Sequence, residues 1–267
     1  MSSHFVAAWG LAGLLTVMGL LTAPLERRIY GSECGPRRKL MAYGITIAVL
    51  WTLALAAIRI CGWTPLLHSP AAPEAWLPAA PITAPVIGVL TGVYLFVALL
   101  PLFQSLRGPR WRGAYAAAIR RGFSTLPGLL PGAGAERAAF ILVSLSAGVC
   151  EEILFRGFLI RLLHGGALAF PLLGALAASS LIFGLGHAYQ GFKGVLSTAV
   201  AGLFLGLLFL LSGALIPAMA LHALLDLQVV YVLWPASTKA LTRQGNRREA
   251  DSFEDGGSGD LSRSFGP

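Results

Sequence analysis

The sequence predicts an all-α protein, a polytopic transmembrane bundle of seven to eight helices. The chain of 267 residues is 56% hydrophobic and 12% charged, and its mean hydropathy is +0.72. A soluble domain that hides one core does not reach such values. The apolar residues also gather in runs of about 20, the length of a helix that crosses a bilayer. Both observations argue against a soluble protein.

Seven apolar runs have the length of a membrane span. They are Phe5–Ala23, Met41–Ile60, Ala84–Phe103, Ala138–Leu163, Leu168–Gly186, Gly194–Leu211 and Ala214–Trp234. An eighth segment, re-entrant or interfacial, would fit in either long loop. The first run is interpreted as a span and not as a signal peptide, because no Lys or Arg precedes it.

These spans divide the chain into three regions. Residues 1–137 hold three spans and a basic loop, and residues 138–234 form a core of four spans. Residues 235–267 are polar and rich in Gly and Ser, a composition that predicts a disordered tail.

The basic residues predict the orientation of the chain. The net charge of +8 does not indicate a nucleic-acid partner, because Lys and Arg lie in loops between spans and not on one folded face. With the N-terminus outside and the C-terminus in the cytoplasm, all but three of the 20 Lys and Arg residues are cytoplasmic. The exceptions are Arg59, Arg156 and Arg161. Short loops and a composition rich in Ala, Gly, Leu and Arg favour a bacterial plasma membrane.

Two long loops differ in character. The segment Cys61–Thr83 contains five prolines and neither Lys nor Arg, and we expect an extended exterior loop there. The segment Gln104–Arg137 is strongly basic, and four bulky apolar residues recur in it every four positions. They are Trp111, Tyr115, Ile119 and Phe123. This pattern predicts an amphipathic helix on the anionic cytoplasmic leaflet, with an ordinary solvated basic loop as the alternative.

The fourth span carries charges far from either of its ends. Charged side chains at membrane depth are costly, and they persist where they pair, line a wet cavity or have a function. Glu152 and Arg156 are four residues apart and share a helical face, so they can form an ion pair. Glu151 points about 100° away from Glu152 on a helix of 3.6 residues per turn. Arg156 therefore cannot easily neutralise both carboxylates, and Glu151 needs another partner.

The later spans add further polar groups. Of the twelve acidic residues only Glu151, Glu152 and Asp226 lie within predicted spans. His187 ends the fifth span, and His222 lies four residues before Asp226 in the seventh. At about 1.5 Å per residue, Glu151 and His222 fall at similar depths in a core of about 30 Å. His187 should instead lie near the cytoplasmic surface, unless the fifth helix tilts or breaks near its C-terminal glycines or the predicted ends of the span are inaccurate.

This polar set permits three interpretations. A buried glutamate can act as a general base toward water while histidines polarise a carbonyl. The residues His187, His222 and Asp226 or Glu152 also have the ligand types for a divalent metal such as zinc. The third interpretation is an ion-pair network that only joins helices, with Glu152–Arg156 and His222–Asp226 as its two pairs.

Three motifs follow one another on successive apolar segments. They are Glu151-Glu152-x-x-x-Arg156, Phe183-x-x-x-His187 and His222-x-x-x-Asp226. Over about Ala138–Trp234 this resembles the CPBP family of CAAX proteases and bacteriocin-processing enzymes, also called the Abi family.

The resemblance implies a helical membrane bundle whose motif residues meet in a cavity. By this analogy Glu151 activates water with help from His187, while His222 and residue 226 stabilise the oxyanion. Glu152 and Arg156 support the site. In the prenyl-protease members the third motif ends in Asn, and Asp226 departs from it, which puts a simple donor role in doubt.

We therefore interpret the chain as an intramembrane endopeptidase that hydrolyses a peptide bond in or near the bilayer. Its expected partners are membrane lipids and a peptide or membrane-protein substrate, with no nucleic acid. The alternative is a non-enzymatic transporter, or a bacteriocin-immunity or scaffold protein, that uses the same polar cluster. The polar residues lie in one half of the chain only, which favours the enzyme.

Overall fold

The computed structural model describes residues 3–31, 35–72, 83–124, 126–132 and 134–233. All but Leu233 belong to one compact unit, Met1–Val232. No β-strand occurs in these described ranges, where the one bridge, between His68 and Ala214, is isolated. The all-α prediction is confirmed. The tail that we predicted to be disordered, 235–267, lies outside the described residues.

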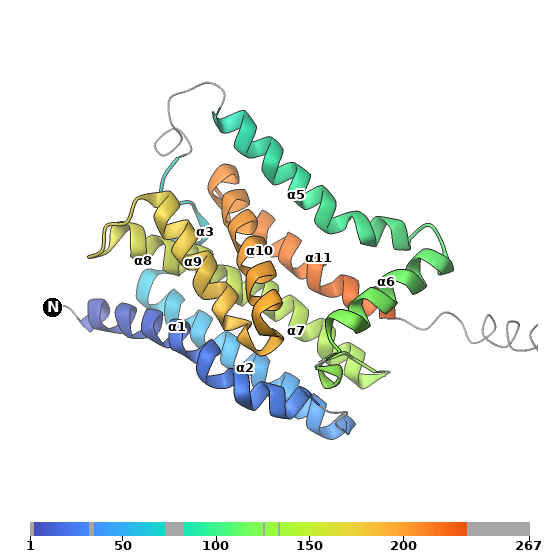
Figure 1. The fold of residues 1–267 in the computed structure, drawn as a ribbon. Helices are drawn as coiled ribbons and strands as arrows, with labels where there is room; N and C mark the ends of the chain where they lie inside the picture. The colour runs from blue at the N-terminus through green and yellow to red at the C-terminus, as the bar shows by residue number, and fades with distance from the viewer. Residues whose placement is uncertain (1–2, 32–34, 73–82, 125, 133, 234–267) are drawn as a thin grey trace, which may run out of the picture. The chain divides into compact units, whose positions relative to one another are not determined.

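The helices follow the predicted runs closely (Figure 1). They are α1 (Ser3–Tyr30), α2 (Pro36–Cys61), α3 (Trp63–Leu67), α5 (Thr83–Ser105), α6 (Pro109–Gly122), α7 (Ala135–Glu152), α8 (Ile160–Gly165), α9 (Leu172–Gly186), α10 (Gly191–Ser212) and α11 (Ile216–Leu233). Between α7 and α8 the chain forms a π-helix, Ile153–Leu159, and short 3₁₀ turns cover Pro127–Leu129 and Ala188–Gln190. Six segments of the described chain are long and apolar enough to cross a membrane. The chain is thus a multi-pass membrane protein.

The helix of the fifth predicted span, α9, is shorter than we predicted. The expected span Leu168–Gly186 forms a helix only over Leu172–Gly186, which is 15 residues. At 1.5 Å per residue such a helix is about 22 Å long, less than the hydrocarbon core of about 30 Å. Pro171 precedes its first turn, where a missing N–H is tolerated, and the helix ends at Gly186.

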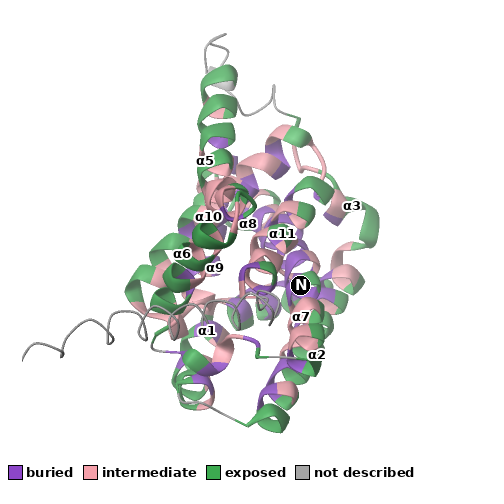
Figure 2. Cartoon of the chain, turned by 90° about the vertical axis from the view of Figure 1, so that its right-hand side faces the viewer, coloured by how far each residue is buried: buried purple, intermediate pink, exposed green. Residues whose placement is uncertain are grey.

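The core lies around the continuous helical segment Ala135–Gly165. Every residue of its π-helical part, Ile153–Leu159, is buried. In Figure 2 the buried residues gather toward the interior, whereas α5 is mainly exposed. Val89 and Phe96 of α5 expose 63% and 59% of their surface, which suits contact with lipid tails. A stacked pair of rings, Tyr94 and Phe204, joins α5 to α10 with centroids 3.9 Å apart.

The proline-rich loop differs from the extended loop that we expected. Its first part forms the short helix α3, and Leu66 within it is completely buried. The carbonyl oxygen of Leu66 would lie 2.7 Å from a Cβ added at Gly157 of the π-helix, so the two backbones approach closely there. Residues 73–82 of this loop lie outside the described ranges.

The amphipathic helix predicted in the basic loop exists as α6, but most of its apolar side faces protein. Ile119 is buried and Tyr115 is half-buried, while Trp111 exposes 48% of its surface. Arg112 donates from Nη2 to the carbonyl oxygen of Tyr231 at 2.7 Å and lies over the Tyr231 ring. These contacts hold α6 against the end of α11, and the position of α6 on a lipid surface stays a prediction.

Candidate active site

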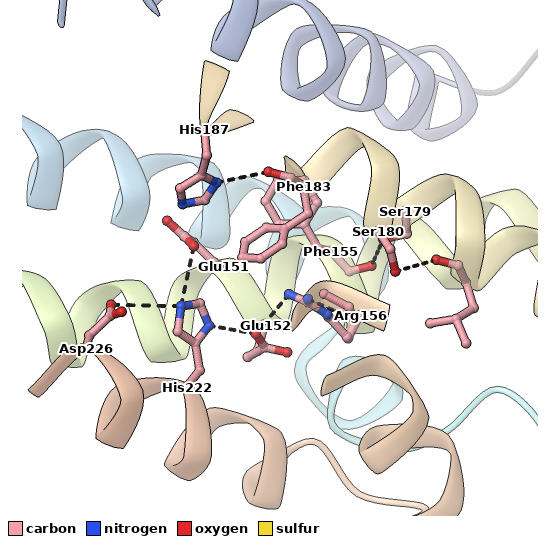
Figure 3. A network of polar contacts seen from close by, with 12 residues as sticks. Glu151, Glu152, Phe155, Arg156, Ser179, Ser180, Phe183, His187, His222 and Asp226 are labelled. Carbon is pink, nitrogen blue, oxygen red and sulfur yellow. Dashed lines mark hydrogen bonds and ion pairs between the residues drawn. The ribbon is translucent and has the colours of Figure 1, made fainter. Parts of the chain in front are cut away.

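Glu152 is the carboxylate that joins the predicted ion pairs (Figure 3). Its Oε1 accepts hydrogen bonds from Arg156 Nη1 at 2.8 Å and from His222 Nδ1 at 2.7 Å. The side chain of Glu152 is completely buried and that of Arg156 is 1% exposed. The predicted pairing of Glu152 with Arg156 is present, and the bond to His222 links it to the third motif. In place of two separate pairs there is one network.

Arg156 is held from three sides. Besides Glu152, its Nη2 donates to the carbonyl oxygen of Gly202 in α10 at 3.1 Å. Its guanidinium lies 4.3 Å from the centroid of the Phe183 ring in α9, a cation–π contact. A Cβ added at Gly202 would lie 2.9 Å from Phe183 Cδ1 and 3.1 Å from Arg156 Nη2, so this position has no room for a side chain. The buried cation therefore ties the π-helix to α9 and α10.

His222 has its two nitrogens directed at different groups. An ionised carboxylate only accepts hydrogen bonds, so the nitrogen that contacts Glu152, Nδ1, carries the hydrogen. Its Nε2 lies 3.7 Å from Glu151 Oε2 and 3.8 Å from Asp226 Oδ2. His222 thus stands between the supporting carboxylate and two acids that are not hydrogen-bonded to it.

The side chain of Glu151 points toward His187 and His222, which agrees with its predicted direction on the helix, away from Arg156. Figure 3 shows its carboxylate between His187 and His222, away from Arg156. The side chain is 16% exposed, and Oε2 is buried without a hydrogen-bond partner among the described residues. An unbonded carboxylate oxygen beside two imidazoles can accept a proton from water.

His187 lies beside Glu151, on the side of that carboxylate away from His222 (Figure 3). It directly follows α9, which ends at Gly186, as the predicted span does. The backbone of His187 leaves the helix at φ −103° and ψ 22°, and its Nδ1 lies 3.0 Å from the carbonyl oxygen of Phe183. A carbonyl only accepts, so Nδ1–H donates and Nε2 remains available as an acceptor. The structure thus brings His187 to the other motif residues, while its depth in a bilayer stays a prediction.

Phe183, Gly148 and the π-helix complete the support of the site. The ring of Phe183 lies 5.0 Å from that of His187 and 5.9 Å from that of His222, edge to face. A Cβ at Gly148 would lie 2.8 Å from the Cβ of Ala223, so α7 and α11 approach closely one turn before Glu152. Sequence reasoning did not identify the role of Gly202, whose carbonyl oxygen accepts the hydrogen bond from Arg156.

A π-helix was also not predicted. Its carbonyl at Phe155 accepts the backbone N–H of Ile160 and the hydroxyl of Ser179 at 2.6 Å. Segments of this kind occur often at functional sites. Neither the hydrophobic pattern nor the motif spacing of the sequence distinguishes this segment from an ordinary α-helix.

The proposed metal ligands do not gather into a metal site. In the described part of the chain, no group of three or more His, Cys, Asp or Glu side chains is placed to hold a metal ion. Nδ1 of His222 and Oε1 of Glu152 are bonded to each other, whereas Nε2 of His222 faces Glu151 and Asp226, and Oε2 of Glu152 has no hydrogen-bond partner among the described residues. We derive no step through a metal, and the metal-free mechanism stays a hypothesis.

Comparison with known proteins finds one family. Residues 134–228 match the family described as type II CAAX prenyl endopeptidase Rce1-like. The matched segment begins one residue before α7, ends within α11 and includes all six predicted site residues. No curated protein and no solved structure matches the chain. The match confirms the resemblance that the three motifs indicated.

Proposed function

We propose that this chain, whose residues 134–228 match a family of CAAX-type intramembrane proteases, is an endopeptidase that hydrolyses a peptide bond in or near the bilayer. The observation that supports this most is the difference between the two adjacent glutamates. Oε1 of Glu152 accepts hydrogen bonds from Arg156 and His222. Oε2 of each glutamate has no hydrogen-bond partner among the described residues, and Glu151 is held only by its 3.7 Å ion-pair contact with His222 there.

In the proposed reaction Glu151 is the general base. Its carboxylate accepts a proton from water, and the water oxygen forms a bond to the scissile carbonyl carbon. His187, whose Nδ1 is held by the Phe183 carbonyl, orients the water through Nε2. The proton then passes from Glu151 to the leaving nitrogen as the C–N bond breaks, which gives a carboxylic acid and an amine.

Charge on the carbonyl oxygen would be stabilised from the His222 side. The Nε2 of His222 can donate only when both ring nitrogens carry hydrogen, and Asp226 can donate only when it is protonated. Glu152 favours the doubly protonated ring because it accepts the Nδ1–H bond at 2.7 Å. A donor aimed at the developing oxyanion is typically worth a factor of about 10²–10³ in kcat.

The first test compares Glu151→Gln with Glu152→Gln in cells and in purified protein. We expect Glu151→Gln to abolish cleavage of membrane proteins while abundance and melting temperature stay near wild type, because the amide keeps the volume but cannot accept the proton. Glu152→Gln should also lower the melting temperature, because Arg156 then lacks its buried counter-charge. Substantial cleavage by Glu151→Gln would show that Glu151 is not the general base. If the wild type shows no cleavage that depends on Glu151, the result favours the non-enzymatic alternative.

The second test concerns Asp226 and metal. Without a metal, Asp226→Asn provides a permanent donor of similar shape, and we expect activity to be kept or raised. If Asp226 bound a divalent ion together with His187 and His222, Asn would be a much poorer ligand. The measurement is turnover of wild type and Asp226→Asn, each with and without a chelator. Loss of activity in both the Asn variant and the chelated wild type would contradict the metal-free mechanism.

A further inference from the structure

His187 stands at the junction of two helices. The helix α9 ends at Gly186, a 3₁₀ turn covers Ala188–Gln190, and α10 begins at Gly191 with φ +80°. His187 caps α9 itself, because its backbone N–H donates to the Gly184 carbonyl and its Nδ1 lies 3.0 Å from the Phe183 carbonyl. The carbonyl groups of the turn that follows are bonded from a different helix.

The N-terminal helix α1 supplies a donor at this turn. Arg27 donates from Nη2 to the carbonyl oxygen of Ala188 at 2.5 Å and from Nε to that of Tyr189 at 3.2 Å. These carbonyls belong to the two residues that directly follow His187. The planar guanidinium can bond two neighbouring acceptors at once, which fixes their direction better than a single ammonium group would.

A second contact holds α1 against the same end of α9. A Cβ added at Gly19 would overlap the Cα of Gly186 and lie 2.8 Å from the carbonyl oxygen of Leu185. Gly19, Ala23 and Arg27 follow one another at a spacing of four residues, so they form one row along α1. Gly19 and Ala23 of this row are buried.

From these contacts we infer that Arg27 is a positioning residue, which acts on the reaction by holding His187 in place. The inference rests on the proposed function. Arg27 and Gly19 lie outside the matched residues 134–228, so the N-terminal region takes part in building the site.

The test that does not depend on activity is NMR of protein labelled with ¹⁵N-histidine. The chain has five histidines, and the His187 signal is identified by its loss in His187→Gln. We expect Arg27→Gln to shift this signal, while the control Arg28→Gln, an exposed neighbour of the same charge, leaves it in place. Gly19→Ala should shift it as well, and Gly13→Ala should not, because an added Cβ at Gly13 meets nothing within 4 Å.

The kinetic test uses Arg27→Gln and Arg27→Lys. We expect Arg27→Gln to lower kcat by about ten- to a hundredfold with KM little changed, since a misplacement of 1 Å can cost about 10²-fold. Arg27→Lys should be faster than Arg27→Gln, because one charged donor remains. If Arg27→Gln does not fold, Arg27→Lys is used in both the NMR and the kinetic test.

If the His187 signal does not shift in folded Arg27 variants, the inference is wrong, whatever their rate of cleavage. Cleavage that depends on Glu151 but is unaffected by Arg27→Gln also overturns it and leaves the proposed function intact. Absence of such cleavage in the wild type counts against the proposed function alone, and the NMR result still decides the role of Arg27.

Discussion

At the scale of single residues, two neighbouring glutamates have different surroundings. Glu152 accepts bonds from Arg156 and His222 on one oxygen, and it is completely buried. Glu151 forms no hydrogen bond through Oε2 within the described ranges, where its ion-pair contact with His222 is 3.7 Å long. Because one residue along a helix changes direction by about 100°, the same side chain can support a site at one position and face a substrate at the next.

The first residue-scale prediction concerns Arg156→Ala. This change leaves Glu152 buried without its cation and removes the donor to the Gly202 carbonyl. Breaking a buried pair in this way typically costs about 3–5 kcal/mol, so folded protein should decrease and not only the rate. Thermal melting of purified protein is the measurement. Arg156→Lys keeps the charge but not the planar group, so its melting temperature should lie between those of wild type and Arg156→Ala. An unchanged melting temperature for Arg156→Ala would contradict the buried pairing.

At the scale of elements, two irregular segments place the polar groups. The π-helix Ile153–Leu159 carries Arg156, which contacts α9 and α10, and the turn after α9 begins at His187, which lies beside Glu151 (Figure 3). Both depart from a regular α-helix at the point where a motif residue stands.

Two adjacent serines allow the π-helix to be tested. Ser179 donates to the Phe155 carbonyl of the π-helix at 2.6 Å, while Ser180 donates to Leu176 within its own helix at 2.8 Å. Both are buried. We expect Ser179→Ala to lower stability by about 1 kcal/mol and activity with it. Ser180→Ala should be nearly neutral, because the Leu176 carbonyl keeps its place in the helix. Melting curves and turnover of both variants decide this, and equal effects would show that the cross-helix bond has no special role.

The sequence predicted the regular parts of this fold and the membership of the polar cluster. Apolar runs located the helices, and the four-residue spacing of Glu152 and Arg156 predicted their contact. The spacing of His222 and Asp226 predicted a shared face, which the structure has at 3.8 Å. The bond between Glu152 and His222 joins residues 70 positions apart, and no local pattern encodes it. The end of α9 at Gly186 agrees with the predicted end of the fifth span. The position of His187 beside Glu151 depends on how separate helices pack, which local spacing does not encode.

At the scale of the whole molecule, the orientation in the membrane stays a prediction. The Lys and Arg bias places the N-terminus outside and the loop with Arg107 and Arg121 in the cytoplasm, in the plasma membrane of a bacterium. Reporter fusions in this loop should therefore behave as cytoplasmic, and fusions near Pro70 as exterior. The opposite pattern would invert the orientation and place the Arg27 end of α1 on the exterior side.

The short helix α9 has a consequence for the lipids around the protein. A helix of about 22 Å cannot match a hydrocarbon layer of about 30 Å. Hydrophobic mismatch of this kind is relieved when the acyl chains beside the helix compress or when polar head groups descend toward its end. The bilayer beside α9 should therefore be locally thin, and this shortens the path of water from the membrane surface to Glu151.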